Sequence, residues 1–292
     1  MTGKIVSLIT AVILALPLAA CGKAENAAAP VFEEIRPFET ESAADTATEG
    51  AATEHEPPDT AESHAADVQF TVATFNIKHG ADGLDKVADA IRGVSPDVVG
   101  LEEVDVGCAR SNFADEPAEI ARLAGFDHYA FSKAISLGDG EYGTAILSKY
   151  PIESFEVVPL DPGRGEGRSV GHAVISVGGV TLDVLVTHLS YEDRDARGRQ
   201  LEYINTMLKG FDRYVLTGDF NSFELEEIYE TGGYYFVNRP GRQYDTFRRF
   251  SGYAPDNIIV SEGFTELSSG VSDAEGSDHR LLFATFLMSA ER

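Results

Sequence analysis

Five short motifs carry the side chains that could do chemistry in this chain of 292 residues. Each motif lies in or beside an apolar, strand-like run and presents Asp, Glu, Asn or His. In chain order they are Thr74-Phe75-Asn76, Leu101-Glu102-Glu103-Val104-Asp105, Thr187-His188-Leu189, Gly218-Asp219-Phe220-Asn221 and Ser277-Asp278-His279. Carboxylate and amide oxygens suit a hard divalent cation, and His suits proton transfer near neutral pH. Together these residue types can hold a cation, activate water and grip a phosphate group.

Asp219 and Asn221 show how such a motif could work. They stand two residues apart after the apolar run 214–216, so strand alternation places both side chains on the same side. A carboxylate beside an amide can orient a water molecule and donate to a phosphoryl oxygen. His279 comes just before the last apolar run, and it suits general-base work because an unperturbed His titrates near neutral pH.

The five motifs, in their order and in their residues, resemble those of the endonuclease/exonuclease/phosphatase superfamily, and the resemblance covers roughly residues 68–288. The resemblance implies a phosphoester hydrolase, a phosphodiesterase or a phosphatase, that depends on Mg²⁺ and could accept Mn²⁺ instead. It makes Glu103 the main Mg²⁺ ligand, with Asn76 supporting the metal or the phosphate. Asp278 matches an Asp of the metal site or one that positions the base. Glu102 stands where the family usually has Gln, and along a strand it should point to the face opposite Glu103, in a structural role.

The resemblance also implies the catalytic roles. Asp219 positions the attacking water or binds the metal, and Asn221 stabilises the transition state. His188 can donate to a phosphate oxygen or protonate the leaving oxygen. The family pairs its histidine with an Asp in an Ile-Asp-Tyr-Ile strand, and residues 255–260 match that strand, so Asp256 is the expected partner of His279. Whether His279 or Asp219 is the general base stays open.

Further residues are expected near the substrate. Arg110 and Arg168 match basic positions that lie near the substrate in relatives. Tyr142 belongs to a stretch that resembles the family's central strand, and it is a candidate substrate contact. Either Tyr142 or Glu141 is expected to orient His188.

Strand-like and helix-like patterns alternate from residue 68 onward, and these elements must position the motifs. The predicted strands are residues 68–77, 97–101, 142–148, 152–158, 169–177, 180–187, 214–217, 257–260 and 281–287, and the predicted helices are residues 84–91, 116–123 and 195–209. Gly178-Gly179 between two strands predicts a hairpin. The pattern by itself indicates an α/β or α+β domain. The resemblance implies a four-layer α/β sandwich, with two mixed β-sheets packed face to face and helices outside.

The N-terminal region is expected to lie outside the catalytic domain, which occupies residues 68–292. Residues 5–20 form a mostly apolar run that is too short to span a bilayer, so residues 1–20 are predicted to be a signal peptide. The small residues before Cys21 resemble a bacterial lipobox, so Cys21 is expected to be lipidated; the alternative is a soluble secreted protein. Residues 21–67 predict a disordered acidic tether, which would leave the domain in the bacterial envelope, lipid-anchored and facing the periplasm or the exterior. Only Cys108 then remains, and no intrachain disulfide is expected.

The formal charge of −25 limits the expected partners. Proteins that coat duplex DNA carry basic patches, so this charge argues against high-affinity duplex DNA binding. The expected substrate is a phosphoester, such as a phospholipid headgroup, a sugar phosphate or an extracytoplasmic nucleotide, and the loops at 107–116, 161–167 and 234–244 are expected to select it. Two other functions stay open: an extracytoplasmic nuclease of the same family, and a non-catalytic lipoprotein that binds a ligand. We expect a monomer, and monoester or diester specificity stays open.

Overall fold

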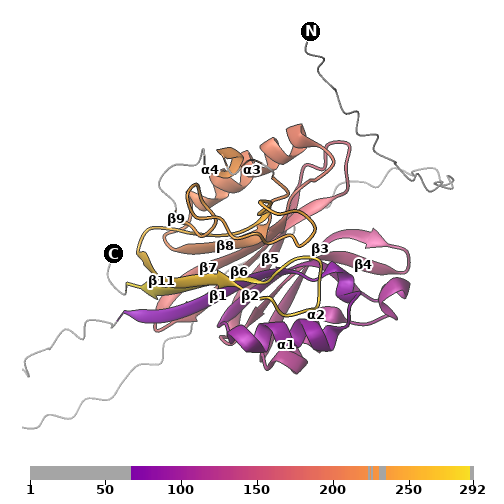
Figure 1. The fold of residues 1–292 in the computed structure, drawn as a ribbon, viewed down its shortest axis with the longest axis horizontal. Coiled ribbons are helices and arrows are strands. Elements are labelled where there is room, and N and C mark those ends of the chain that lie inside the picture. The colour runs from indigo at the N-terminus through magenta and orange to yellow at the C-terminus, as the bar shows by residue number, and fades with distance from the viewer. Residues whose placement is uncertain (1–66, 223, 225, 230–234, 290–292) are drawn as a thin grey trace, which may run out of the picture. The chain divides into compact units, whose positions relative to one another are not determined.

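Two six-stranded β-sheets form the core of the part of the chain that the computed structural model describes, which is residues 67–289 without 223, 225 and 230–234 (Figure 1). The predicted signal peptide, Cys21 and the predicted tether as far as residue 66 lie outside the described residues. Among the residues that are described, none of the helices combines the length and the apolar content that crossing a bilayer requires.

Both sheets are mixed. The first contains β1 (Val68–Asn76), β2 (Val98–Val106), β3 (His128–Leu137), β4 (Gly140–Ser148), β11 (Phe264–Val271) and β12 (Leu282–Met288), in the order β11-β12-β1-β2-β4-β3. The second contains β5 (Ile152–Leu160), β6 (Arg168–Val177), β7 (Val180–His188), β8 (Tyr214–Asp219), β9 (Tyr235–Phe236) and β10 (Asp256–Val260), in the order β5-β6-β7-β8-β10-β9. One pair in each sheet is parallel, β1 with β2 and β7 with β8.

Two of the main helices begin at residues whose side chains cap them. The main helices are α1 (Leu84–Val94), α2 (Glu116–Ala124) and α3 (Arg194–Leu208), and the short elements are α4 (Glu226–Tyr229), η1 (Lys78–Gly80) and η2 (Ala109–Ser111). The side chain of Asp115 accepts a hydrogen bond from a backbone N–H in the first turn of α2. Asp193 does the same for two backbone N–H groups of α3. Such caps satisfy N–H groups that a helix leaves unpaired.

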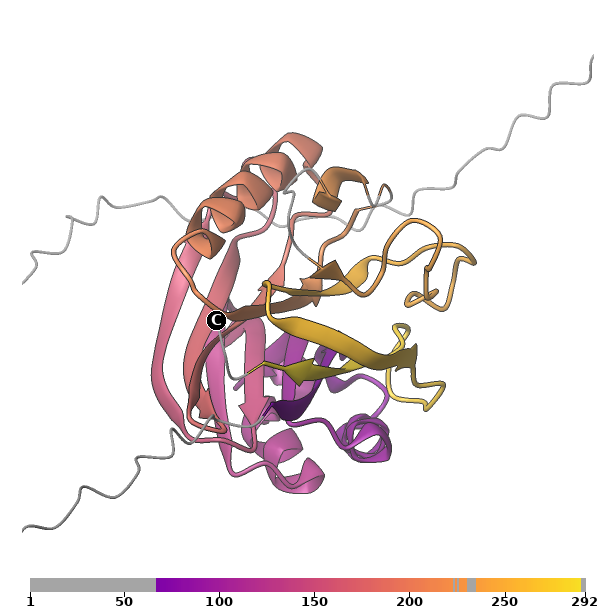
Figure 2. The ribbon, with the colours of Figure 1, turned by 90° about the vertical axis from the view of Figure 1, so that its left-hand side faces the viewer.

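Three hydrophobic clusters separate four layers. Between the sheets, Phe70 and Val98 of the first sheet belong to one cluster with Val184 of the second. The outer face of the first sheet packs on α1 and α2, as Leu101 does in the cluster that contains Ile91. The outer face of the second sheet packs on α3. Figures 1 and 2 show α1 and α2 on one side of the paired sheets and α3 on the other. The predicted four-layer sandwich is confirmed.

The two parallel pairs bring chemistry-bearing residues to one end of each sheet. α1 lies between β1 and β2 along the chain, and α3 lies between β7 and β8. The register pairs Asn76 with Glu102 in the first sheet and His188 with Asp219 in the second. Parallel strands carry their carboxyl ends to the same edge, so each sheet presents a pair of motif residues there.

All of the predicted strands and helices are present, and so is the hairpin, in which Val177 pairs with Val180 across the two glycines. β3, β9 and β11 were not predicted. Each is the outermost strand on its side of a sheet. A strand with only one neighbour can hold more polar residues, and β11 has no buried residue and is interrupted by a register shift. The alternating pattern that identifies inner strands is therefore weak at these edges.

The sheets lie close together at Gly100, two residues before the first glutamate of the second motif. A Cβ atom at Gly100 would lie 2.1 Å from Thr217 Oγ1 and 3.0 Å from Val186 Cγ2. Both residues belong to the facing sheet, so any side chain at this position forces the layers apart.

Gly100→Ala should therefore destabilise the domain by about 1–3 kcal/mol, the usual effect of overpacking a core. Gly93→Ala is the matched control, because Gly93 lies in α1 with open space around its Cβ position. There the same change should stabilise by about 0.5–1 kcal/mol. Urea unfolding of both variants measures the difference, and equal free energies of unfolding would contradict the close approach of the sheets.

Candidate active site

Asn76 joins the two sheets at the end of β1, and its amide contacts a carboxylate from each. Nδ2 donates to Glu103 Oε1 and to Asp219 Oδ2, both at 3.0 Å. Oδ1 accepts a hydrogen bond from the backbone N–H of Lys78 at 3.1 Å, which fixes the orientation of the amide. Asn76 is buried, so these bonds are shielded from water. Two carboxylates from different sheets are thereby held around a single atom.

A β-bulge brings two consecutive glutamates to the same region. The register of β2 against β4 shifts here, and Glu103 has a φ of 57°. This left-handed conformation costs a residue other than glycine about 1–2 kcal/mol, so the surrounding structure must hold it. Asn76 donates to Glu103, while Thr74 Oγ1 donates to Glu102 Oε1 at 2.8 Å. The prediction that Glu102 and Glu103 point to opposite faces was wrong, because the bulge interrupts the alternation.

Glu102 is a fully buried acid beneath the site. Burial raises its pKa well above the usual value, and the negative charges of Asp256 and Asp219 raise it further. The hydrogen bond from Thr74 opposes this shift only in part. The structure therefore favours the protonated, neutral form of the Glu102 side chain.

His279 and Asp256 form a buried ion pair, with Asp256 at the start of β10 and His279 just before β12. His279 Nδ1 lies 2.9 Å from Asp256 Oδ2 and 3.2 Å from Oδ1. Burial opposes a charge on the ring, but the attraction of Asp256, followed by that of Asp219 and Asp278, outweighs it and raises the pKa of His279 to about 10. His279 therefore carries a positive charge at neutral pH, with Asp256 at the nitrogen where the resemblance implied a partner.

Asp219 lies at the centre of the group, at the end of β8. Its Oδ1 accepts a hydrogen bond from the backbone N–H of Asn221 at 2.9 Å. Its Oδ2 lies 3.7 Å from His188 Nε2 and 3.8 Å from His279 Nε2. Burial and then the charge of Asp256 raise the pKa of Asp219 to about 6, against the opposing charge of His279. A carboxylate with this pKa is ionised at pH 7 and can take up a proton near neutrality.

His188, at the end of β7, lies between two hydrogen-bond donors. Asn221 Nδ2 is 2.9 Å from Nε2, and Arg168 Nη1 is 3.2 Å from Nδ1. A charged imidazole carries N–H groups at both nitrogens and would meet a donor at each, so this environment favours the neutral ring. Burial lowers the pKa of His188 well below its usual value, and the charges of Arg168 and His279 lower it further. A neutral His188 suits hydrogen bonding to a phosphate better than protonation of a leaving group.

The prediction that Tyr142 or Glu141 orients His188 was wrong. Glu141 Oε1 accepts a hydrogen bond from Lys133 Nζ at 2.7 Å instead. Burial raises the pKa of the Tyr142 hydroxyl group, and the nearby charge of Arg168 opposes this rise. Arg168 takes the position beside the His188 ring because β6, which it begins, is the neighbour of β7 in the sheet.

Arg110 and Tyr142 lie together on another wall of the cleft. Arg110 Nε and Nη2 donate to the two carboxylate oxygens of Asp105 at 2.8 and 2.7 Å. The guanidinium lies 5.2 Å from the centroid of the Tyr142 ring, within reach of a cation–π contact. Asp105 is fully buried, whereas 41% of the Arg110 side chain is exposed, so one edge of the guanidinium stays accessible to a substrate.

Asp278 has two cationic partners. Its Oδ2 lies 3.4 Å from Lys78 Nζ and 3.5 Å from Arg249 Nη2. The predicted metal residues are thus divided in the structure: Glu103 lies against Asn76, while Asp278 faces the basic rim of the cleft.

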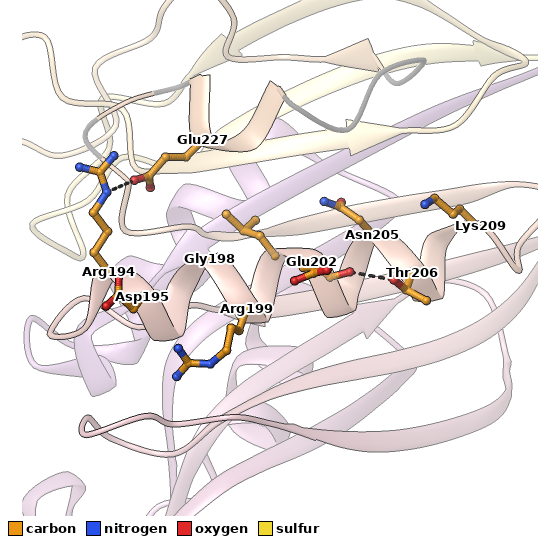
Figure 3. A pocket seen from close by; sticks show the side chains of 10 residues that line it. Arg194, Asp195, Gly198, Arg199, Glu202, Asn205, Thr206, Lys209 and Glu227 are labelled. Carbon is orange, nitrogen blue, oxygen red and sulfur yellow. Dashed lines mark hydrogen bonds and ion pairs between the residues drawn. The ribbon is translucent and has the colours of Figure 1, made fainter.

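These groups line one cleft of about 370 Å³. Its lining comprises Lys78, His79, Glu103, Arg110, Tyr142, Arg168, His188, Tyr191, Asp219, Asn221, Phe247, Asp278 and His279. A larger hollow of about 700 Å³ runs along α3, lined mostly by one side of that helix (Figure 3). Its charges pair locally, since Arg194 Nε lies 2.6 Å from Glu227 Oε1. The motifs therefore converge in the smaller cleft, which is the candidate active site.

The donor set of the cleft fits a hard divalent cation. Glu103 and Asp219 bring carboxylate oxygens to the Asn76 amide, and Mg²⁺ prefers oxygen ligands. One ligand atom each of Asp219, Asp256 and His279 also lie within 4.8 Å of one another. The His279 ring is a poor ligand here because it is charged and bound to Asp256. A cation would relieve the repulsion between Asp219 and Asp256 that raises the pKa of Asp219.

Several residues that line the cleft were not predicted from the sequence. Lys78 and His79 have φ values of 52° and 45°, which are rare for residues other than glycine, and this turn puts them on the cleft wall. Phe247 packs edge-on against His279, with 4.9 Å between the ring centroids. The position of Lys78 and His79 directly after the Asn76 motif could have pointed to them, whereas the sequence around Phe247 carries no such signal.

Comparisons with known proteins agree with this geometry. A sequence model of the Endonuclease/Exonuclease/phosphatase family matches residues 73–279, which include all five motifs. The chain is 28% identical over 176 residues to YbhP of Escherichia coli, a protein described as uncharacterized, and that alignment covers 53% of this chain and 67% of YbhP. An endonuclease/exonuclease/phosphatase from Beutenbergia cavernae has a similar structure, with a TM-score of 0.65 and 24% identity over 76% of this chain and 72% of that one. A mannosyl-6-phosphatase of Bacteroides thetaiotaomicron has a TM-score of 0.58 and 16% identity over 75% of this chain and 100% of that one. The two structural likenesses show a shared fold.

Asp256→Asn should lower the pKa of His279 from about 10 toward the ordinary value, because the amide keeps the shape of the carboxylate and removes its charge. NMR titration of the His279 ring in both proteins measures the change. A pKa that stays near 10 in Asp256→Asn would contradict the assigned cause.

The same substitution has a pH-dependent effect on stability. The folded-state pKa of His279 lies above the unfolded value of about 6.5, so the ion pair stabilises fully below about pH 6.5 and its contribution is lost as the pH rises through about 10. The difference in free energy of unfolding between the wild type and Asp256→Asn should therefore shrink between about pH 6 and about pH 10. Urea unfolding across this range is the measurement.

Proposed function

The chain belongs to the Endonuclease/Exonuclease/phosphatase family, and from this membership we propose that it is a metal-dependent hydrolase of phosphoester bonds. The observation that carries the proposal is the convergence of Glu103, Asp219 and His279 in one cleft, although they come from distant parts of the chain and from both sheets. Oxygen ligands for a cation stand there beside one charged and one neutral imidazole. Such a site can bind a phosphate group and orient a water molecule against it.

The proposed metal site uses the bulge and the amide at the end of β1. Glu103 would hold Mg²⁺, with Asn76 beside it, and Mn²⁺ could take its place. When bound, the cation would act as a Lewis acid that neutralises phosphate charge. Asn76 already holds Glu103 close to Asp219 by its hydrogen bonds, so little rearrangement of the protein is needed.

Of the two candidates for the general base, Asp219 is supported better. With a pKa of about 6 it is ionised at neutral pH and can accept a proton from a water molecule beside it. His279 has a pKa of about 10 and is already protonated, so it cannot accept one. In this proposal His279 donates a hydrogen bond from Nε2 to a phosphoryl oxygen, while Asp256 holds Nδ1.

Asn221 and His188 complete the proposed centre by stabilising the charge that develops on the phosphate. Asn221 has a φ of 49°, and this turn holds its amide between His188 and the backbone oxygen of Leu189, to which Nδ2 donates at 3.0 Å. In the free protein the two hydrogens of Asn221 Nδ2 are engaged by His188 Nε2 and by Leu189 O. A phosphoryl oxygen would therefore replace one of these partners when it accepts a hydrogen bond in the centre.

The proposal extends to the location of the enzyme. Cys21 is lipidated in this account, and the domain is anchored in the bacterial envelope facing the periplasm or the exterior. The support is in the sequence, where the apolar run of residues 5–20 ends in small residues before Cys21 and an acidic stretch follows. More than one acyl chain on a single Cys gives stable anchoring. The partners are then a phosphoester substrate and the membrane, and the enzyme acts as a monomer.

His279→Ala should lower turnover by about 10²–10³-fold, the usual effect of removing a donor that stabilises a transition state. The test is a panel of bis-p-nitrophenyl phosphate, plasmid DNA, sphingomyelin and inositol phosphates, each with Mg²⁺ or Mn²⁺. His128→Ala is the matched control, because His128 begins β3 and does not line the cleft.

Two results of the same panel would contradict the proposed mechanism. EDTA should abolish hydrolysis and added Mg²⁺ should restore it, so full activity in EDTA would remove the metal from the mechanism. Unchanged turnover of His279→Ala on every hydrolysed substrate would remove His279.

Cys21→Ala should release the protein from membranes, because lipidation needs the thiol. Fractionation of cells that express each protein, together with labelling by a fatty acid, measures the effect. Cys108→Ala is the control, since Cys108 is buried in the domain and should not affect anchoring. Membrane association that survives in Cys21→Ala would contradict the proposed anchor.

A further inference from the structure

Arg168 is a buried cation whose bonding capacity is only partly used. Its side chain is 5% exposed, and it lies on the wall of the candidate active site. Nη1 lies 3.1 Å from Glu166 Oε1, whereas Nη2 lies 3.8 Å from Glu192 Oε2, too far for a hydrogen bond. Nε is buried and has no hydrogen-bond partner among the described residues. Leaving a buried donor unsatisfied is costly, so the site is built for an additional acceptor.

A phosphate group would satisfy this guanidinium better than the carboxylate does. The two Nη groups of the planar guanidinium form a fork that matches two oxygens of a phosphate. Glu166 engages Nη1, whereas Glu192 lies too far from Nη2 to accept a hydrogen bond from it. An incoming phosphate could occupy both positions, and it would return the Glu166 carboxylate to water.

The side chain of Glu166 can move away from Arg168 without any movement of the backbone. It lies between Gly165 and Gly167, and a Cβ at Gly167 would lie 2.8 Å from Ile135 Cγ2, so the loop packs closely against β3. The side chain of Glu166 itself is 35% exposed. Rotation of this side chain toward solvent is therefore enough to open Arg168.

The anion at Arg168 would be distinct from the phosphate that reacts. Arg168 contacts Nδ1 of His188, whereas Asp219 and Asn221 lie at Nε2 on the other side of the ring. The imidazole therefore stands between the guanidinium and the proposed catalytic centre. One extended substrate can reach both positions, with one anionic group at each.

We propose that Arg168 forms a second anion-binding subsite, which Glu166 occupies in the free protein. This subsite selects substrates that carry a second phosphate or a carboxylate beside the scissile phosphoester. The inference rests on the proposed function for its role in substrate choice. The anion-binding property of Arg168 can be tested without turnover.

The test is a titration of the full chain in EDTA with inorganic phosphate, followed by the NMR signal of the Arg168 Nε–H group. The signal should shift and saturate, and Glu166→Gln should bind phosphate about tenfold more tightly, because its side chain no longer competes. Glu153→Gln is the matched control, since it removes the same charge from an exposed position on β5. An Arg168 signal that does not respond, or a Glu166→Gln affinity equal to that of Glu153→Gln, would overturn the proposal.

Kinetics then test the role in selection. Thymidine 5′-(p-nitrophenyl phosphate) and the same compound with a 3′-phosphate share the scissile bond and differ by one anionic group. The phosphorylated compound should have a KM about tenfold lower in the wild type, and Arg168→Gln should remove this difference; equal KM values in the wild type would overturn the selection. Failure to hydrolyse either compound, or any ester of the panel, would count against the proposed function alone, because the titration decides on the subsite independently.

Discussion

Buried negative charge at the place where the two sheets meet is the constraint on which the rest of the site depends. Glu102, Asp219 and Asp256 are at most 2% exposed, and acids this deep must be neutralised, paired or hydrogen-bonded. The structure uses all three solutions. Burial keeps Glu102 neutral, hydrogen bonds hold Asp219, and the charged imidazole of His279 pairs with Asp256. Burial and the neighbouring charges raise the pKa of Asp219 to a value that suits proton transfer. The same burial and charges must be compensated for the fold to be stable.

The architecture explains why this charge collects at one point. Each sheet contains one parallel pair of strands with a helix between them along the chain, and each pair ends in polar residues that face each other in register. Because the sheets stack with these ends at the same edge, a single amide can span them, as Asn76 does. The close contact at Gly100 keeps the layers near enough for that bridge.

Much of this could be predicted from the sequence, and what could not has physical reasons. The inner strands were identifiable because burial on both faces makes them apolar, and the motifs at their ends marked the site. Three edge strands, β3, β9 and β11, were not predicted, because one side of each has no neighbour to impose that pattern, whereas the edge strand β5 was predicted. The direction of Glu102 was wrong because a bulge depends on the partner strand and leaves no trace in local alternation. The predicted neighbour of His188 was wrong because the pairing of β6 with β7 decides which side chain lies beside this ring. Sequence spacing does not report the order of strands in a sheet.

The pairing of β1 with β12 has a consequence for how the domain comes into being. Val68 pairs with Met288, so a strand at the beginning of the domain waits for one at its very end before the first sheet is complete. Contacts between such distant segments form slowly, because a long loop must close first. A nascent chain that lacks its last strand therefore holds its acids apart and hydrated, and the candidate site is complete only when that strand docks.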